Sequence, residues 1–168
     1  MKTLTVFTPT YNRKHTIGRT YDSLCRQTCG DFEWLVIDDG SSDGTREWVE
    51  SLGDKVQLEG LRFDWMGRVL DGEDENHFVI QTPKFRLEYV YKPNGGLYTG
   101  YNVAYATIQT ELCVCIDSDD YMPDDAVEKI LKCWKERGNP NVAGILGLDS
   151  YINGEPIGGY FPDGIDTL

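Results

Sequence analysis

Apolar positions in the first part of the chain alternate between runs typical of strands and spacings typical of helices. Leu4 to Thr8 (LTVFT) is rich in β-branched residues and ends at Pro9, and Phe32 to Ile37 (FEWLVI) is almost continuously apolar. Such runs are typical of strands, and the second is typical of a strand covered on both faces. Two amphipathic helices are predicted after these strands. Their apolar stripes are Ile17, Tyr21, Leu24, Cys25 and Thr28, and then Trp48, Val49 and Leu52.

The same alternation continues in the second part of the chain. Phe85 to Tyr91 alternates like a strand, and Leu112 to Ile116 reads as a buried strand. Two further helical stripes are predicted. They are Leu97, Tyr101, Ala104, Tyr105 and Ile108, and, after Pro123, Val127, Ile130, Leu131 and Trp134. The chain therefore predicts an α/β sandwich of three layers around a mostly parallel central sheet.

Two segments depart from this alternation. Residues 53–84 carry scattered charges and aromatics without sustained periodicity, and we expect them to be an insertion folded onto the edge of one domain spanning 1–168. Near the end, Ala143 to Ile152 and Ile157 to Phe161 flank Asn153-Gly154, which predicts a C-terminal β-hairpin.

Polar clusters stand where three of the predicted strands end. TPTYNR closes the first strand, DDGSSD the second, and DSDD the strand at Leu112 to Ile116. In open α/β sheets, ligands bind beyond the carboxyl ends of the strands. We therefore expect the three clusters to converge on one crevice.

The cluster DSDD gathers carboxylates in a chain that is already acidic. Asp117 and Asp119, two positions apart after a strand, can share a hard divalent cation through oxygen ligands. Mg²⁺ or Mn²⁺ held by one or two carboxylates completes its coordination with water and substrate phosphates. The alternative is an acidic turn that caps the helix after Pro123.

The other two clusters each have two interpretations. Asp38 and Asp39 can accept hydrogen bonds from a nucleobase or a ribose, or can form an Asx-type turn before a helix cap. Thr8, Pro9 and Tyr11 can offer backbone groups and a flat aromatic surface for a base, or Tyr11 is an ordinary surface aromatic.

The stretch KPNGGLYTGYN follows the strand at Phe85 to Tyr91. Lys92 can reach a phosphate, and Gly95 and Gly96 allow the backbone to approach a ligand closely. A pair of glycines before a helix is otherwise typical of a plain loop.

Charge and motif content narrow the class of ligand. The net charge of −12 argues against binding of nucleic acid, and neither a P-loop nor a G-x-G-x-x-G motif is present. A phosphate ligand would then need a bound cation, so we expect Mn²⁺ or Mg²⁺ as cofactor.

Cysteine usage and the absence of long apolar runs indicate the compartment. The five cysteines form no C-x-x-C pair, and we expect reduced thiols with Cys113 and Cys115 facing the core. No run approaches the length of a membrane span, and no signal peptide is evident at the N-terminus. The sequence therefore predicts a cytoplasmic protein without a transmembrane segment; peripheral membrane association stays open.

Four motifs in this order resemble the family 2 glycosyltransferases of the Rossmann-like GT-A fold. They are TVFTPTYNR, FEWLVIDDGSSDGT, YKPNGGLYTGYNVAYA and CIDSDDYM. The resemblance covers roughly Leu4 to Phe161, apart from the expected insertion at about 53–84. The resemblance implies inverting, metal-dependent transfer of a sugar from a nucleotide-sugar, most often a UDP-sugar. The acceptor would be a saccharide or a lipid-linked saccharide in polysaccharide or glycoconjugate synthesis.

The resemblance also implies roles for individual residues. The nucleoside would be held by Pro9, Tyr11 and Asp39, with Asp38 beside them. Asp117 would contact the ribose or the metal. Asp119 would be the main metal ligand. The remaining residues expected in the nucleotide-sugar crevice are Thr8, Lys92, Gly95, Gly96, Asn102 and Ser118. Gly100-Tyr101-Asn102 and Gly95-Gly96-Leu97-Tyr98 depart from the Ala-Arg-Asn and Gly-Gly-Lys-His of many relatives.

The general base expected from the resemblance is a carboxylate well downstream of the metal motif. The sequence ends at IDTL, so we expect that base beyond Leu168 and the domain to be either truncated or naturally short. Two alternatives stay open: a catalytically incomplete nucleotide-sugar-binding domain and a nucleotidyltransferase. A nucleotidyltransferase would be expected to carry glycines and basic residues after the first strand, and TPTYNRKH lacks the glycines.

Overall fold

The central element of the fold is a six-stranded mixed sheet. The computed structural model of the protein describes residues 2–58, 60–70, 72 and 75–160. In the sheet the strands follow the order β3-β6-β7-β2-β1-β8. Their bounds are β1 Leu4–Thr10, β2 Phe32–Asp38, β3 Asp54–Gln57, β6 His77–Gln81, β7 Arg86–Tyr91 and β8 Leu112–Cys115. β7, β2, β1 and β8 are mutually parallel, whereas β6 pairs antiparallel with β7 and β3 pairs antiparallel with β6. The expected mostly parallel α/β sheet is therefore confirmed.

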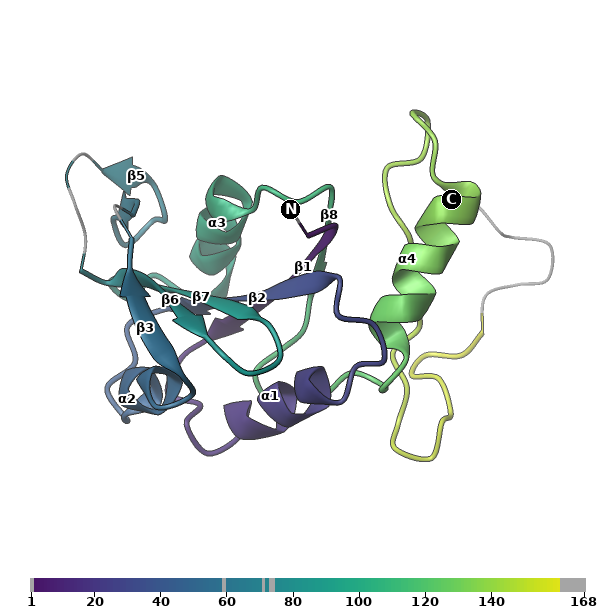
Figure 1. Cartoon of the computed structure of the whole chain (residues 1–168), viewed down its shortest axis with the longest axis horizontal. Helices are drawn as coiled ribbons and strands as arrows, with labels where there is room; N and C mark the ends of the chain where they lie inside the picture. Colours follow the sequence, from purple (N-terminus) through teal and green to yellow (C-terminus); the bar gives the residue numbers. More distant parts are fainter. Residues whose placement is uncertain (1, 59, 71, 73–74, 161–168) are drawn as a thin grey trace. The chain divides into compact units, whose positions relative to one another are not determined.

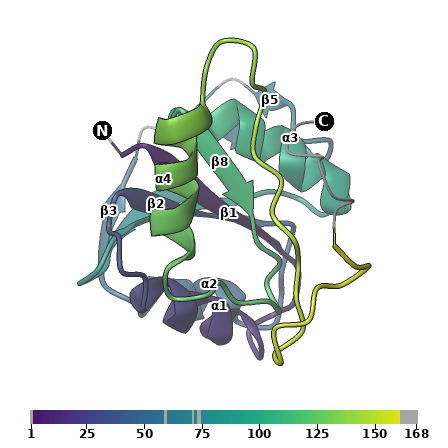
Figure 2. The same ribbon diagram turned by 90° about the vertical axis from the view of Figure 1, so that its right-hand side faces the viewer.

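Helices cover both faces of this sheet, as Figures 1 and 2 show. Their bounds are α1 Ile17–Cys25, α2 Thr45–Glu50, α3 Leu97–Thr107 and α4 Ala126–Arg137. α1 and α2 lie on one face, where Ile17, Leu24 and Val49 join the larger core cluster. α3 lies on the other face and buries Val103 and Ala104 in a second cluster. The predicted helices therefore form, but the expected apolar stripe of α3 is partly wrong. Leu97 and Tyr105 are 61% and 63% exposed, and the buried residues of α3 are Thr99, Gly100, Val103 and Ala104.

The strand β2 shows why the continuous apolar run predicts a buried strand. Trp34 is fully buried, and its indole Nε1 donates a hydrogen bond of 2.9 Å to Thr8 Oγ1 in the neighbouring strand. Leu35, next along β2, and Phe7 of β1 belong to the α3-side cluster instead. Because both faces of β2 are covered, neither face needs the polar residues of a half-exposed strand.

Residues 53–84 contribute to two sheets. β3 and β6 extend the edge of the main sheet beyond β7. β4 (Arg62–Phe63) and β5 (Val69–Leu70) form a separate two-stranded antiparallel ribbon. We refer to residues 61–70 as the β4–β5 hairpin. That the whole of 53–84 is an insertion into one domain stays a prediction.

The chain divides into two compact units, Met1–Leu131 and Lys132–Leu168. The first contains every strand of the main sheet. In the second, the described residues hold a turn about Asn153-Gly154 closed by a single antiparallel bridge between Ser150 and Pro156. The expected C-terminal hairpin is therefore wrong as a pair of strands, and its Phe161 lies outside the described residues. The physical reason is burial: Ile152 is 89% exposed, so alternation there has no core to face.

A second correction concerns the thiols. Cys113 is exposed and Cys115 half-buried, rather than both facing the core. β8 is the outer strand of the sheet and pairs only with β1 among the described strands, so it lacks the covering that a central strand receives.

Candidate functional site

The carboxyl ends of β1, β2 and β7 meet at one edge of the sheet. Thr10 is in register with Asp38, and Asp38 with Tyr91. Backbone hydrogen bonds continue the pairing into the loops, from Asp39 N to Thr10 O (2.9 Å) and from Lys92 N to Asp38 O (2.9 Å). The loops TPTYNR, DDGSSD and KPNGG therefore meet at this edge. Of the three clusters expected to converge, TPTYNR and DDGSSD do so here, and the third, DSDD, follows β8.

Asp39 joins two of these loops through its carboxylate. Oδ1 accepts a hydrogen bond from the backbone N–H of Gly95 (2.9 Å), and Oδ2 accepts from the N–H of Gly96 (2.8 Å) and from Asn94 Nδ2 (3.2 Å). Asn94 Nδ2 also donates to the Asp39 carbonyl at 2.8 Å. The Asn94-Gly95-Gly96 turn thus wraps around one carboxylate, and its conformation depends on Asp39.

Lys92 completes this arrangement. Its side chain is fully buried, and its ammonium forms an ion pair with Asp39 and donates to Pro93 O at 2.8 Å. Asp39 and Lys92 are predicted separately from the sequence as contacts to a ligand, and the structure brings them together as partners of each other. A buried pair of this kind orients both loops because neither charge is tolerated alone in the interior.

Asp38 supports the same turn through a different set of bonds. It is fully buried; Oδ1 accepts from Ser41 N (2.7 Å) and Oδ2 from the Tyr89 hydroxyl (2.6 Å). Burial raises the pKa of the Asp38 carboxyl, against the opposing effect of the hydrogen bonds from Tyr89 and Ser41. Tyr89 is a supporting residue that sequence reasoning missed, since nothing marks it apart from the other aromatics of an alternating strand.

The loop after β1 presents one exposed aromatic residue. Thr8 and Pro9 are buried, with Thr8 bonded to Trp34, while Tyr11 is 51% exposed. Asn12, at a φ of 53°, holds the loop against the DDGSS turn. Its N–H donates to Ser41 Oγ and its Oδ1 accepts from Ser42 N, both at 2.8 Å. Tyr11 is therefore the flat surface that this loop offers.

The DSDD turn is anchored by its backbone, and its three aspartates, Asp117, Asp119 and Asp120, are exposed. Thr20 Oγ1 of α1 donates to Asp120 O at 2.8 Å, and Asp120 N donates to Asp117 O at 3.1 Å. Ser118 is buried, whereas Asp117 and Asp119 are exposed. Arg13 Nη2 lies 3.8 Å from Asp119 Oδ2.

This donor set can be tested against a divalent cation. Among the described residues no group of three or more His, Cys, Asp or Glu side chains is placed to hold a metal ion. Two exposed carboxylates fit Mg²⁺ or Mn²⁺, because these ions retain waters and take substrate phosphates as further ligands. They do not fit a structural zinc site, which needs four protein ligands.

Asn102 lies in the second turn of α3, and its amide is used within the protein. Nδ2 donates to the Met66 carbonyl in the β4–β5 hairpin at 3.0 Å. This contact links a residue expected in the crevice to the 53–84 segment, whose packing here the sequence alone does not predict.

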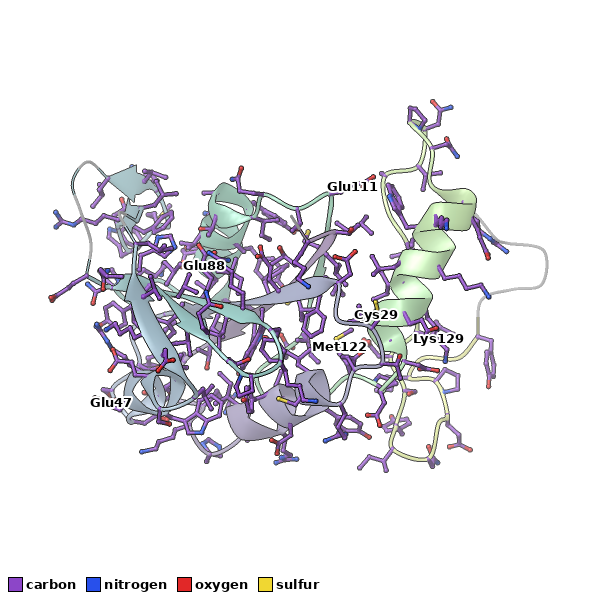
Figure 3. The ribbon with its side chains drawn as sticks, in the orientation of Figure 1. Cys29, Glu47, Glu88, Glu111, Met122 and Lys129 are labelled. Atoms are coloured by element: carbon purple, nitrogen blue, oxygen red, sulfur yellow. The ribbon has the colours of Figure 1, made fainter. Side chains whose placement is uncertain are left out.

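Cavities lined by described residues border the sheet at opposite edges. One of about 320 Å³ adjoins the carboxyl ends of β2 and β7 and includes Glu47, which lies on α2 (Figure 3). Its other lining residues are Ser41, Ser42, Gly44, Arg46, Asn76 and Tyr91. Another, about 660 Å³, lies at the opposite edge and is lined by Lys2, Asp31, Glu33, Arg86, Glu88, Thr107, Gln109 and Thr110. The smaller of the two is the one that touches the converging loops.

The sequence matches the model of Glycosyl transferase family 2 over residues 5–68 and 69–155. The chain belongs to this family. The resemblance drawn from the four motifs is therefore confirmed.

Relatives share the sequence over most of this chain but are longer. A chondroitin synthase of Pasteurella multocida (strain Pm70) is 30% identical over 129 residues, which are 77% of this chain and 10% of the relative. A putative teichuronic acid biosynthesis glycosyltransferase of Bacillus subtilis (strain 168), TuaG, is 29% identical over 135 residues, which are 80% of this chain and 42% of TuaG. The chain thus spans less than half the length of either relative.

Solved structures share the fold. TarS of S. aureus in complex with UDP-GlcNAc has a TM-score of 0.59 and 25% identity, over 81% of this chain and 32% of TarS. A mannosyltransferase of Pyrobaculum calidifontis in complex with GDP-Man and Mn²⁺ has a TM-score of 0.57 and 23% identity, over 83% of this chain and 33% of that structure. The GT-A fold expected from the sequence is confirmed.

Proposed function

We propose that this domain binds a nucleotide-sugar, with UDP as the nucleotide, at the carboxyl edge of its sheet. The observation that carries the proposal is the convergence of three family motifs around Asp39, with the exposed carboxylates of the fourth motif, Asp117 and Asp119, following β8. The UDP-GlcNAc bound to TarS supports UDP as the nucleotide. In the whole protein the domain supplies the donor to an inverting sugar transfer.

The nucleoside end of the donor is assigned to the first two loops. Tyr11 offers its exposed ring to the base, and Pro9 lies buried near the end of β1, two residues before it. Asp39 and its ring of N–H donors form the wall of the site, and Thr8 and Asp38 act as positioning residues because both are buried and bonded within the protein. Gly96 allows close approach of the donor since it carries no side chain, while Gly95 is assigned to hold Asp39 through its N–H.

The diphosphate end is assigned to the DSDD turn. Asp117 and Asp119 would hold Mn²⁺ or Mg²⁺, and Ser118 would fix the turn between them. The metal, when bound, would neutralise negative charge on the nucleoside diphosphate leaving group. The pairing of Lys92 with Asp39 leaves the cation as the principal positive charge for the phosphates in this proposal.

The remaining parts of the activity are proposals about the whole protein. The acceptor is a saccharide or a lipid-linked saccharide, as the names of the chondroitin synthase and teichuronic acid relatives suggest. The general base that takes the acceptor proton is not assigned to any residue of this chain. We place the protein in the cytoplasm; in the described part of the chain no helix has both the length and the apolar character to span a bilayer.

Calorimetric titration of the domain with UDP, GDP, CDP and ADP in MnCl₂ tests the proposal. We expect UDP to bind most tightly and the Tyr11→Ala variant to bind it about tenfold more weakly, because base stacking on an aromatic ring contributes about 1–3 kcal/mol. If GDP bound more tightly than UDP, the assigned donor would be a GDP-sugar instead of a UDP-sugar. Absence of binding by all four nucleotides would overturn the proposal.

A further inference from the structure

The β4–β5 hairpin packs against the turn that grips Asp39. The Trp65 carbonyl oxygen abuts Gly95 so closely that a Cβ added there would overlap it. Gly67, at a φ of +76°, faces the Thr99 carbonyl in the first turn of α3 in the same way. The two glycines therefore permit a close backbone-to-backbone contact that no other residue would allow.

Two further contacts fix the hairpin in this place. Asn102 Nδ2 donates to the Met66 carbonyl at 3.0 Å. Phe63 is 3% exposed and packs in the α3-side core with Val103 and Ala104. Figure 1 shows β5 on the same side of the sheet as α3. The hairpin is thus attached to both the start and the second turn of α3.

The tip of the hairpin is organised by one carboxylate. Asp64 Oδ1 accepts from Met66 N (2.8 Å) and Arg68 N (3.0 Å), and Oδ2 accepts from Arg68 Nε (2.8 Å). The Asp64 carbonyl also accepts from Gly67 N at 3.0 Å. These bonds all lie within the tip and fix its backbone conformation. The Trp65 carbonyl is therefore held against Gly95, and the Met66 carbonyl is held within hydrogen-bond distance of Asn102.

From these contacts we infer that the β4–β5 hairpin is a positioning element of the nucleotide site. The hairpin holds Gly95 in place, and the N–H groups of Gly95 and Gly96 hold the Asp39 carboxylate. The hairpin therefore sets the position of Asp39 in the proposed nucleoside site. Asp64 and Gly67 are positioning residues in this sense, and neither is assigned a contact with the ligand. The inference rests on the proposed function.

The test measures the dissociation constant of UDP in MnCl₂ for variants of the hairpin tip. Asp64→Ala removes the acceptor that orders the tip and is expected to weaken UDP binding about tenfold, or about 1.4 kcal/mol. Asp64→Asn keeps an Oδ1 acceptor for the two backbone N–H groups and is expected to restore most of the affinity. A melting midpoint that stays near the wild-type value separates this effect from loss of the fold.

A pair of glycine variants tests the contact with α3 independently. Gly67→Ala is expected to weaken UDP binding, because its Cβ would meet the Thr99 carbonyl. Gly72→Ala is the matched control, since Gly72 also has a positive φ, +106°, but nothing in the described part of the chain lies within 4 Å of its added Cβ. It is expected to bind UDP like the wild type.

The outcomes distinguish the two proposals. A wild-type domain that binds no UDP overturns the proposed function and this inference with it. A wild-type domain that binds UDP, with unchanged affinity in Asp64→Ala and Gly67→Ala, overturns this inference alone. If Gly67→Ala does not fold, the comparison of Asp64→Ala with Asp64→Asn decides.

Discussion

At the scale of single residues, buried charge organises the candidate site. Asp39 and Lys92 are both buried and form an ion pair, while Asp38 is buried beside them and is held by Ser41 and Tyr89. A buried charge is tolerated only when other groups compensate it, so each of these residues constrains its neighbours.

Replacement of Lys92 tests how strongly the pair holds the two loops. Lys92→Met leaves the buried Asp39 carboxylate without its counter-ion, and we expect the free energy of unfolding to fall by about 3–5 kcal/mol. Lys129→Met is the control, because Lys129 is exposed on α4 (Figure 3) and pairs with Asp125 at the surface. It should cost no more than about 1 kcal/mol. Urea unfolding of the two variants measures the difference, and equal losses would contradict the assigned role of Lys92.

Replacement of Asp38 is predicted to have a pH-dependent effect. Burial raises the pKa of this carboxyl above its ordinary value of 3.8, so between that value and the raised one the folded state binds more protons than the unfolded state. The stability of the wild type should therefore fall as pH rises through this window. Asp38→Asn has no proton to lose, and it keeps an acceptor for Ser41 N.

We accordingly expect Asp38→Asn to gain stability relative to the wild type as pH rises above 3.8, because only the wild type loses a proton that its folded state holds more tightly. Unfolding free energies measured from about pH 4 to pH 8 provide the test. A difference between variant and wild type that does not change with pH would contradict the assigned burial effect.

At the scale of elements, the β4–β5 hairpin is the part of the chain whose attachment is most easily probed. Phe63→Ala should lower the free energy of unfolding by about 3–5 kcal/mol, because it empties a buried aromatic position. Amide hydrogen exchange across the described residues of the hairpin should quicken at the same time. Val69→Ala serves as the control, since Val69 is 51% exposed in the same hairpin. Loss of stability without faster exchange there would show that Phe63 does not anchor the hairpin.

The elements differ in how far the sequence predicts them, and burial explains the difference. Both faces of β2 are covered, so nearly all its positions are buried and its sequence is a continuous apolar run. This run is what predicts the strand. β3 has four exposed residues, DKVQ, and forms only because β6 offers it a pairing edge, so no periodicity marks it. The predicted strands about Asn153-Gly154 fail for the opposite reason, since their alternation faces no core.

The candidate site is predicted in its location but not in its internal contacts. Strand ends in a parallel sheet meet at one edge, so the motifs predict that the loops carrying Tyr11 and Asp39 converge, as the pairing of β1 with β2 shows. The ion pair between Asp39 and Lys92 joins residues 53 positions apart, and the contact of Asn102 with Met66 depends on the conformation of the 53–84 segment. Neither follows from a local pattern, because each is decided by tertiary packing.

At the scale of the whole molecule, the negative net charge of the chain is unfavourable for binding the anionic ligand that we propose for the candidate site. The chain carries a formal charge of −12, and its DSDD turn exposes further carboxylates to a ligand expected to be anionic. Repulsion of a nucleoside diphosphate by this field is relieved if a divalent cation lies between them. The central claim is therefore that UDP binds through a metal held by Asp117 and Asp119.

A thermal melt with UDP and MnCl₂, compared with UDP and EDTA, tests this claim most directly. At a UDP concentration of about 100 times the dissociation constant, we predict that the wild-type midpoint rises by about 5–10 °C with Mn²⁺ and does not rise with EDTA. Asp119→Asn should melt like the ligand-free wild type and show no rise under either condition. An equal rise with EDTA, or a full rise in Asp119→Asn, would contradict the metal-bridged site.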